Sequence, residues 1–204
     1  YGKEEKMNMS IPTYPPLSAA VLPGLFANHR FLRHALLVLG GSLFIAVMAQ
    51  LSFRFPASPI PITGQTFAVL IVGMALGSRL GALAALAYCL EGIYFPVFAE
   101  MRTWAHPFTL YTAGYLVGFI GAAYVTGWLA ERGWDRSDVG TGLAMLAGNL
   151  VLYVPGLIWL HVMMSPASFG TVLTAGFGVF IIGDMIKLAL AMILFPVAWR
   201  LINR

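Results

Sequence analysis

The chain has 204 residues, of which 59% are apolar and only 10% are charged. Soluble domains carry about 25% charged residues, so this composition excludes an ordinary soluble domain and indicates an integral membrane protein. The net charge of +4 does not indicate nucleic-acid binding, because the basic residues flank apolar segments and report membrane orientation instead.

The usual motifs of catalysis and cofactor binding are missing from the sequence. Cys89 is the single cysteine and forms no internal disulfide, and the four histidines lack metal-ligand spacing. There is no G-x-x-x-x-G-K-[ST] phosphate-binding loop, so any ATP consumed would be bound by another chain. We therefore expect no catalytic residue, no metal and no cofactor in this chain.

The apolar segments predict an all-α bundle of six transmembrane helices over residues 34–204. Residues 1–33 are polar and then proline-rich, which indicates a cytoplasmic or interfacial segment. The expected spans are about 35–53, 63–76, 80–98, 110–129, 142–164 and 172–194.

Charge sets the orientation of these six spans, which would place both termini on one side of the membrane. Nine Lys and Arg residues fall on that side, whereas only Arg54 and Arg102 fall on the other. The positive-inside rule therefore predicts cytoplasmic termini. The second span is short, because three prolines at 56, 59 and 61 force an extended approach. Short, proline-interrupted spans indicate binding sites in transport proteins.

The last span contains an acid and a base, Asp184 and Lys187, within an apolar run. Residues three apart share one face of a helix, so both side chains point the same way. A charge at mid-membrane costs roughly 2.5–3.5 kcal/mol, so such groups face a protein interior or a polar cavity. The pair either binds a small ligand or only fastens two helices together.

Further polar residues inside the spans are candidate ligand contacts. Glu91 would contact a ligand, pair with Lys187 or hold a helix end in place. Asn149 and Tyr153 share a face of span 5, where they bind a ligand or a neighbouring helix. Gln65 either contacts a ligand together with Thr66 or caps the second span.

Small residues occur on one face of the first span, at Ser42 and Ala46. Small residues one turn apart let another helix approach closely, either within the chain or in a partner. Tyr115, near the outer end of span 4, is an interfacial residue or a ligand contact.

Five segments together resemble the BioY family, the substrate-binding S components of biotin energy-coupling-factor (ECF) transporters. They are residues 59–66 (PIPITGQT), 88–99 (YCLEGIYFPVFA), 112–119 (TAGYLVGF), 153–156 (YVPG) and 183–187 (GDMIK). The resemblance covers about residues 42–200. The chain departs from the family at Glu100-Met101-Arg102, where a glycine-rich turn is usual, and at Ile182, where a proline is usual.

The resemblance implies high-affinity biotin capture at a bacterial cytoplasmic membrane, in partnership with a transmembrane coupling subunit and ATPase subunits. Asp184 and Lys187 would then bind the ureido ring of biotin, with help from Asn149. Arg102 is the better placed candidate for the carboxylate, and Arg54 is the second.

The small-residue face of span 1 is the expected docking surface for the coupling subunit. It comprises Ser42, Ala46 and Ala49. Two alternatives remain at this point. One is a stand-alone biotin transporter driven by an ion gradient. The other is an intramembrane enzyme, for which only His161 and Ser165 lie near an interface, without a motif.

Overall fold

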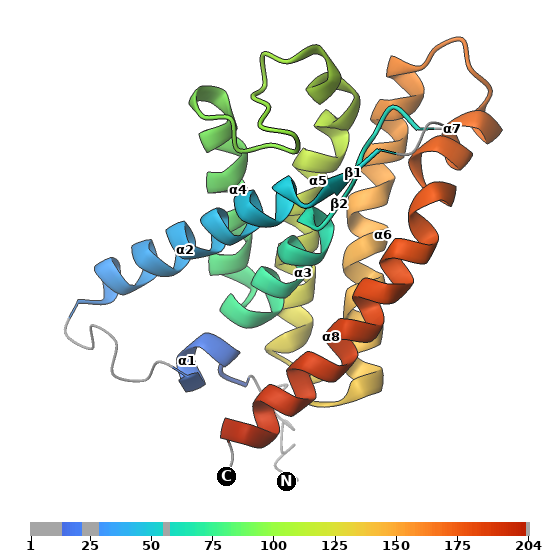
Figure 1. The fold of residues 1–204 in the computed structure, drawn as a ribbon. Helices are drawn as coiled ribbons and strands as arrows, with labels where there is room; N and C mark the ends of the chain where they lie inside the picture. The colour runs from blue at the N-terminus through green and yellow to red at the C-terminus, as the bar shows by residue number, and fades with distance from the viewer. Residues whose placement is uncertain (1–13, 22–28, 55–57, 203–204) are drawn as a thin grey trace, which may run out of the picture.

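The computed structural model of the chain is almost entirely helical over the residues that it describes, which are 14–21, 29–54 and 58–202 (Figure 1). Its α-helices are α1 (Leu17–Val21), α2 (Arg30–Gln50), α3 (Gln65–Leu76), α4 (Ser78–Tyr94), α5 (Pro107–Ala130), α6 (Asp138–Met163), α7 (Phe169–Gly176) and α8 (Ile181–Ile202). Two 3₁₀ turns, η1 (Trp134–Arg136) and η2 (Gly178–Phe180), join the later helices. Strands β1 (Ser52–Phe53) and β2 (Ile62–Thr63) form a short antiparallel pair.

Helices α5 and α6 form the central pair, and α5 also packs against α3 and α4. Gly118 permits this closeness, since a Cβ atom there would lie only 2.9 Å from the Cα atom of Leu152 on α6. The turn between α3 and α4 uses Gly77 with a φ of 84°, a value that favours glycine. The prediction that the helix after the prolines is short agrees with α3, which contains only 12 residues.

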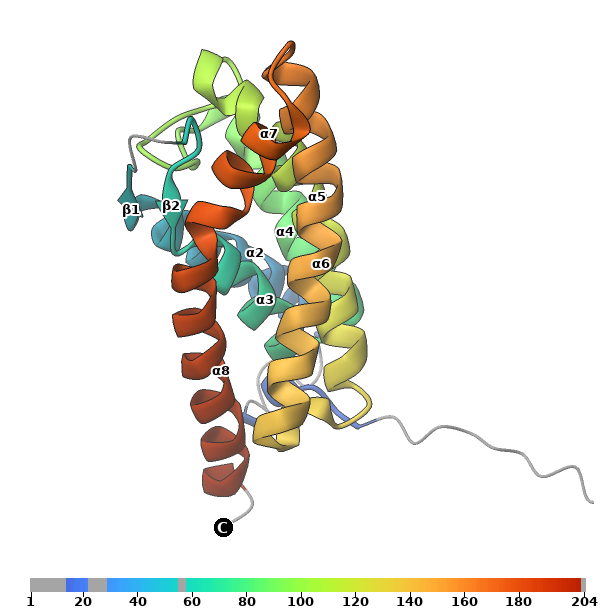
Figure 2. The ribbon, with the colours of Figure 1, turned by 90° about the vertical axis from the view of Figure 1, so that its right-hand side faces the viewer.

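Helix α2 crosses α3 and α4 obliquely (Figures 1 and 2). Its small residues face the protein: Ser42, Ala46 and Ala49 are 1%, 8% and 0% exposed. The prediction that they form a docking surface for a partner is therefore wrong, since side chains buried within the chain cannot contact another subunit. They allow close packing on α4, where a Cβ atom at Gly41 would lie 2.9 Å from the Cβ atom of Ala84.

The sequence predicted one continuous helix in the final apolar run, but the structure divides this run into α7, η2 and α8. Helix α7 ends at Gly176, whose carbonyl accepts a hydrogen bond of 2.9 Å from the hydroxyl of Tyr115. The chain then passes through η2, and α8 begins at Ile181. The break moves the residues before Ile181 out of the long helix and over the upper part of the bundle (Figure 2).

One end of the bundle is joined by polar contacts between segments distant in sequence. Glu131 accepts a hydrogen bond of 2.8 Å from the backbone N–H of Ser78, and Trp199 Nε1 donates to Asp135 Oδ2 at 2.6 Å. The Arg136 guanidinium lies 4.2 Å from the centre of the Trp199 ring. Burial raises the pKa of Asp135. This is the end at which α1 and the last turns of α8 lie in Figure 1.

Four helical stretches among the described residues are long and apolar enough to cross a membrane. They are Arg30–Gln50, Tyr111–Ala130, Asp138–Met163 and Phe169–Ile202. Helix α3 is apolar but shorter, and α4 has 17 residues. The chain is therefore a multi-pass helical membrane protein. Most of the predicted N-terminal segment, residues 1–13 and 22–28, lies outside the described residues.

Candidate ligand-binding site

A cavity lies in the half of the bundle that contains β1, β2 and the α4–α5 loop. The empty space within it, including its opening to solvent, is about 640 Å³. Its lining residues come from the β2 segment, α3, the α4–α5 loop, α5, α6, η2 and α8: Ile60, Pro61, Thr63, Gln65, Thr66, Phe98, Ala99, Arg102, Thr109, Thr112, Tyr115, Leu116, Phe119, Leu152, Tyr153, Phe180 and Lys187.

The acid and base of α8 lie at this cavity. Lys187 Nζ donates to Asp184 Oδ1 at 3.1 Å and to Thr66 Oγ1 of α3 at 2.8 Å. The Tyr153 hydroxyl of α6 donates to the second oxygen of Asp184. The side chains of Lys187 and Asp184 are only 16% and 13% exposed. This cluster of four polar side chains thus joins α3, α6 and α8.

Lys187, Tyr153 and Thr66 line the cavity themselves, whereas Asp184 is not among its lining residues. Asp184 fixes the direction of the Tyr153 hydroxyl and the Lys187 ammonium, both of which are hydrogen-bond donors. Lys187 thus lies where its predicted contact with a ligand requires it. For Asp184, contact with a ligand requires a change of partner.

Gln65 and Tyr115 also line the cavity, as a ligand contact would require. Gln65 Nε2 donates to the hydroxyl of Tyr88 at 2.7 Å, which orients its amide oxygen. The rings of Tyr115 and Tyr153 meet edge to face with their centroids 6.0 Å apart. These aromatic rings give the site an apolar wall with hydroxyl groups at defined positions.

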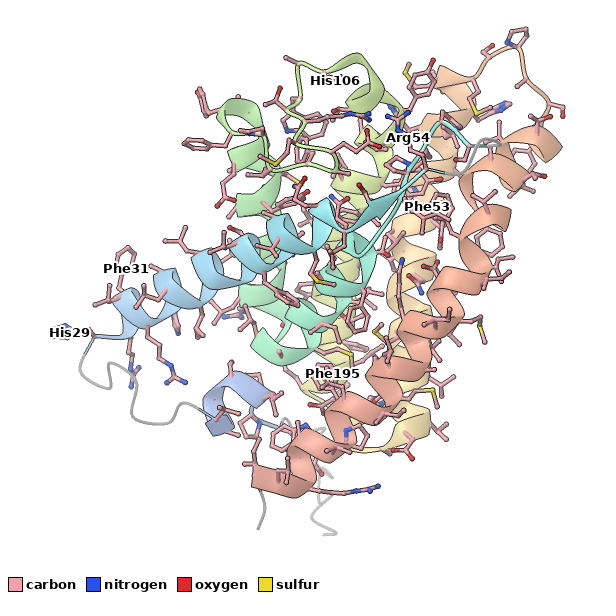
Figure 3. All side chains as sticks on the ribbon, in the orientation of Figure 1. His29, Phe31, Phe53, Arg54, His106 and Phe195 are labelled. Atoms are coloured by element: carbon pink, nitrogen blue, oxygen red, sulfur yellow. The ribbon has the colours of Figure 1, made fainter. Side chains whose placement is uncertain are left out.

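Arg102 lies at the mouth of the cavity and is 11% exposed. Its guanidinium forms an ion pair with Glu100, which also pairs with Arg54 at 2.5 Å. Figure 3 shows Arg54 in the upper part of the molecule, beyond the end of α2 that lies opposite His29 and Phe31. The cavity therefore has a cationic mouth as well as a cation deeper inside.

Besides Asp184, two predicted site residues do not line the cavity. The Glu91 carboxylate accepts a hydrogen bond of 2.6 Å from the Ser42 hydroxyl, so it holds α4 against α2. This geometry contradicts the expectation that Glu91 contacts a ligand or pairs with Lys187. Asn149 is not among the lining residues either, but its buried Oδ1 atom has no hydrogen-bond partner among the described residues.

The structure adds residues that sequence reasoning did not select. Thr109 and Thr112 on α5, Phe98 in the α4–α5 loop and Phe180 in η2 all line the cavity. The two threonines lie three residues apart, and Tyr115 follows Thr112 at the same interval. All three residues therefore lie on one side of α5. That spacing was visible in the sequence, but the approach of Phe180 depends on the break between α7 and α8.

The chemistry of the cavity suits the recognition of a small molecule. Ammonium, hydroxyl and amide groups are arranged among apolar walls, which suits a small molecule with its own donors and acceptors. His161 packs its ring against Phe169, with centroids 6.0 Å apart, and neither His161 nor Ser165 lines this cavity. Fold and site together define a multi-pass membrane protein with a small-molecule site of the transport type.

The chain belongs to the BioY family, whose model matches residues 17–204. It is 37% identical to "Biotin transporter BioY" of Rhizobium etli, over 75% of this chain and 87% of that protein. It is 32% identical to "Biotin transporter BioY" of Thermotoga maritima, over 76% of this chain and 90% of that protein.

A solved structure has the same fold. It is a crystal structure of the S-component for biotin from an ECF-type ABC transporter, with a TM-score of 0.71 and 22% sequence identity. The match covers 87% of this chain and 94% of the other. The arrangement of helices around the cavity is thus a known membrane architecture.

Proposed function

We propose that the chain binds biotin in this cavity and takes it up as the S component of an ECF transporter. The observation that carries the proposal is the pairing of a deep polar group, Lys187 with Tyr153 and Asp184, with a cationic mouth at Arg102. Relatives that share about a third of their residues with this chain are named biotin transporters.

Biotin matches this distribution of groups. Its ureido ring has two N–H donors and a carbonyl acceptor, its sulfur ring is apolar, and its tail ends in a carboxylate. In our proposal Lys187 donates to the ureido carbonyl, and Asp184 accepts from a ureido N–H after releasing one of its present donors. Asn149 does not line the cavity in this structure, and in our proposal its side chain turns toward the ligand so that its buried Oδ1 atom supplies a second acceptor. Arg102 binds the carboxylate.

The binding site would open to the exterior. We infer that α2, α3, α4, α5, α6 and the α7–α8 segment make six crossings, with both termini in the cytoplasm. Arg79, Arg132 and Arg200 lie in or beside elements at the α1 end, whereas Arg54 and Arg102 lie at the cavity end. The positive-inside rule supports this orientation in a bacterial inner membrane.

Uptake against a gradient needs an energy source. The chain has no phosphate-binding loop, so we propose that a transmembrane coupling subunit and ABC-type ATPases supply it. A stand-alone transporter is the competing proposal. The two differ in one measurable property, which is whether uptake continues in cells that lack any coupling subunit.

Equilibrium binding of labelled biotin to the purified protein in detergent tests the first step. We expect saturable binding that Lys187→Met abolishes and that Arg132→Gln, a change at the opposite end, leaves intact. Absence of saturable binding by the wild-type protein would refute the proposed substrate. Uptake of labelled biotin in cells with and without the coupling subunit and ATPases then tests the partnership, since uptake that is equal in both would favour the stand-alone transporter.

A further inference from the structure

Residues 98–102 form a tight reversal at the mouth of the cavity. Phe98 and Arg102 face each other across it, with N–H to carbonyl distances of 3.0 and 3.2 Å. Between them Glu100 and Met101 have φ values of 60° and 55°. Residues with side chains seldom adopt this left-handed backbone, and glycine adopts it freely. The reversal is therefore strained in a way that two glycines would avoid.

The Glu100 side chain makes contacts that a glycine could not make. Its Oε1 atom accepts from Arg54 Nε at 2.5 Å, and its Oε2 atom accepts from Arg54 Nη2 at 2.7 Å. The same Oε2 atom accepts from Nη2 of Arg102. One carboxylate therefore joins an arginine that follows β1 to an arginine of the α4–α5 loop.

The three charged groups are not equivalent with respect to the cavity. Arg102 lines it and is 11% exposed, whereas Glu100 and Arg54 do not line it and are 26% and 47% exposed. Glu100 thus holds Arg102 from the solvent side. A guanidinium has five N–H donors in a rigid plane, enough to bind two carboxylates at once. Fixing Arg102 through Nη2 sets the direction in which the rest of its plane faces.

The strained reversal is also held from α2. The backbone N–H of Met101 donates to Gln50 Oε1 at 3.0 Å, and Gln50 Nε2 donates to the carbonyls of Val97 and Phe98 at 3.2 and 3.1 Å. Residues in left-handed backbone persist where their surroundings fix them, and they gather at ligand sites. The loop is built to keep Glu100 in one place.

We propose that Glu100 is a positioning residue that makes the site selective for ligands with a carboxylate. It holds the Arg102 guanidinium toward the cavity, so that the ligand carboxylate binds a group that is already oriented and loses less conformational entropy. Arg54 keeps Glu100 in place from the outside. This inference rests on the proposed function, because it assumes that biotin binds with its carboxylate at Arg102.

The test compares two ligands of nearly the same shape, biotin and its primary amide, which lacks the negative charge, by equilibrium binding to the purified full chain in detergent. We expect Glu100→Gln to weaken biotin about tenfold, as for one lost charge-assisted hydrogen bond, and to change the amide less than about twofold. Glu100→Gly relieves the backbone strain but removes the carboxylate, and we expect the same selective loss. Glu100→Asp should recover part of the biotin affinity. Asp138→Asn, at the opposite end, controls for the change in net charge and should alter neither affinity.

Three results would overturn the inference. Equal weakening of biotin and the amide would show that Glu100 only maintains the fold, and unchanged biotin affinity in both Glu100→Gln and Glu100→Gly would show no role. Tighter biotin binding would show that Glu100 competes with the ligand instead of positioning Arg102. Arg102→Gln separates this inference from the proposed function. If it loses biotin selectively while the Glu100 variants do not, only the inference fails; if the wild-type protein binds no biotin, both fail.

Discussion

The pairing of Asp184 with Lys187 permits a decisive test of whether the two charges bind a ligand or only join helices. We consider three variants: Asp184→Asn, Lys187→Met and the double variant. In the structure Lys187 donates to Asp184 and Thr66, and Tyr153 donates to Asp184, so each single change leaves a charged group with fewer partners. The double change removes both charges together.

The structure sets the expected magnitudes. Removing one partner of a buried ion pair costs about 3–5 kcal/mol, and partial exposure of 16% and 13% places this pair near the lower limit. Replacing both partners costs much less, because no unpaired charge remains. Ligand affinity behaves differently: two lost hydrogen bonds to charged groups, at about 1.5–3 kcal/mol each, weaken binding by about 10²–10⁴-fold.

Two measurements on the same purified samples separate the roles. Thermal unfolding in detergent should show both single variants destabilised and the double variant close to the wild type. Equilibrium binding of labelled biotin should show all three variants severely weakened, although the double variant is stable. A double variant that binds biotin with wild-type affinity would refute the ligand role and show that the pair only joins α8 to its neighbours.

Three further predictions follow from packing and charge outside the ligand site. Ala46→Leu overfills the contact of α2 with the bundle, so we expect it to lower the free energy of unfolding by about 1–3 kcal/mol and to reduce biotin binding and uptake together. The control variant Leu43→Ala changes a 63% exposed position and should leave the unfolding temperature nearly unchanged. Binding that survives Ala46→Leu at wild-type affinity, with only uptake lost, would restore the docking role of this face. Gly73→Ala places a Cβ atom 2.8 Å from the Cα atom of Ala123, so we expect α3 and α5 to separate. The yield of folded protein, measured by size-exclusion chromatography, should then fall. A monodisperse, fully active variant would contradict this packing. Burial raises the pKa of Asp135 above 3.8, so the folded state binds more protons than the unfolded state and loses stability as pH rises above that value. As pH rises from about 4, the unfolding temperature should therefore fall more steeply for the wild type than for Asp135→Asn, and equal slopes would contradict this prediction.

Much of the fold could be predicted, because membrane helices leave a direct signal in composition. Apolar runs predicted the positions of α2, α5 and α6 within a few residues, since a spanning helix needs about 20 apolar residues. The prolines at 59 and 61 predicted the short α3. The break in the helix at Phe177 was not predicted, because no proline lies there and the run of apolar residues continues through it.

The acid–base pair of the site was predictable for a local reason, whereas the contacts between residues distant in sequence were not. Helical spacing alone places Asp184 and Lys187 on one face, and charges in an apolar run indicate a polar interior. The Ser42–Glu91 contact spans 49 residues, and the Arg54–Glu100 contact spans 46. Such pairings depend on how helices cross, which no local pattern specifies.

The docking prediction failed because of a property of the membrane itself. In water, the apolar face of a helix is the one that is buried, so the pattern identifies the interior. In lipid, large apolar side chains are equally stable facing outward, and small residues mark the closest helix contacts. Helix α2 follows this rule: Ser42 and Ala46 are buried, while Leu39 and Leu43 are 56% and 63% exposed. A small-residue face therefore identifies a tight interface without saying whether the partner is the same chain or another subunit.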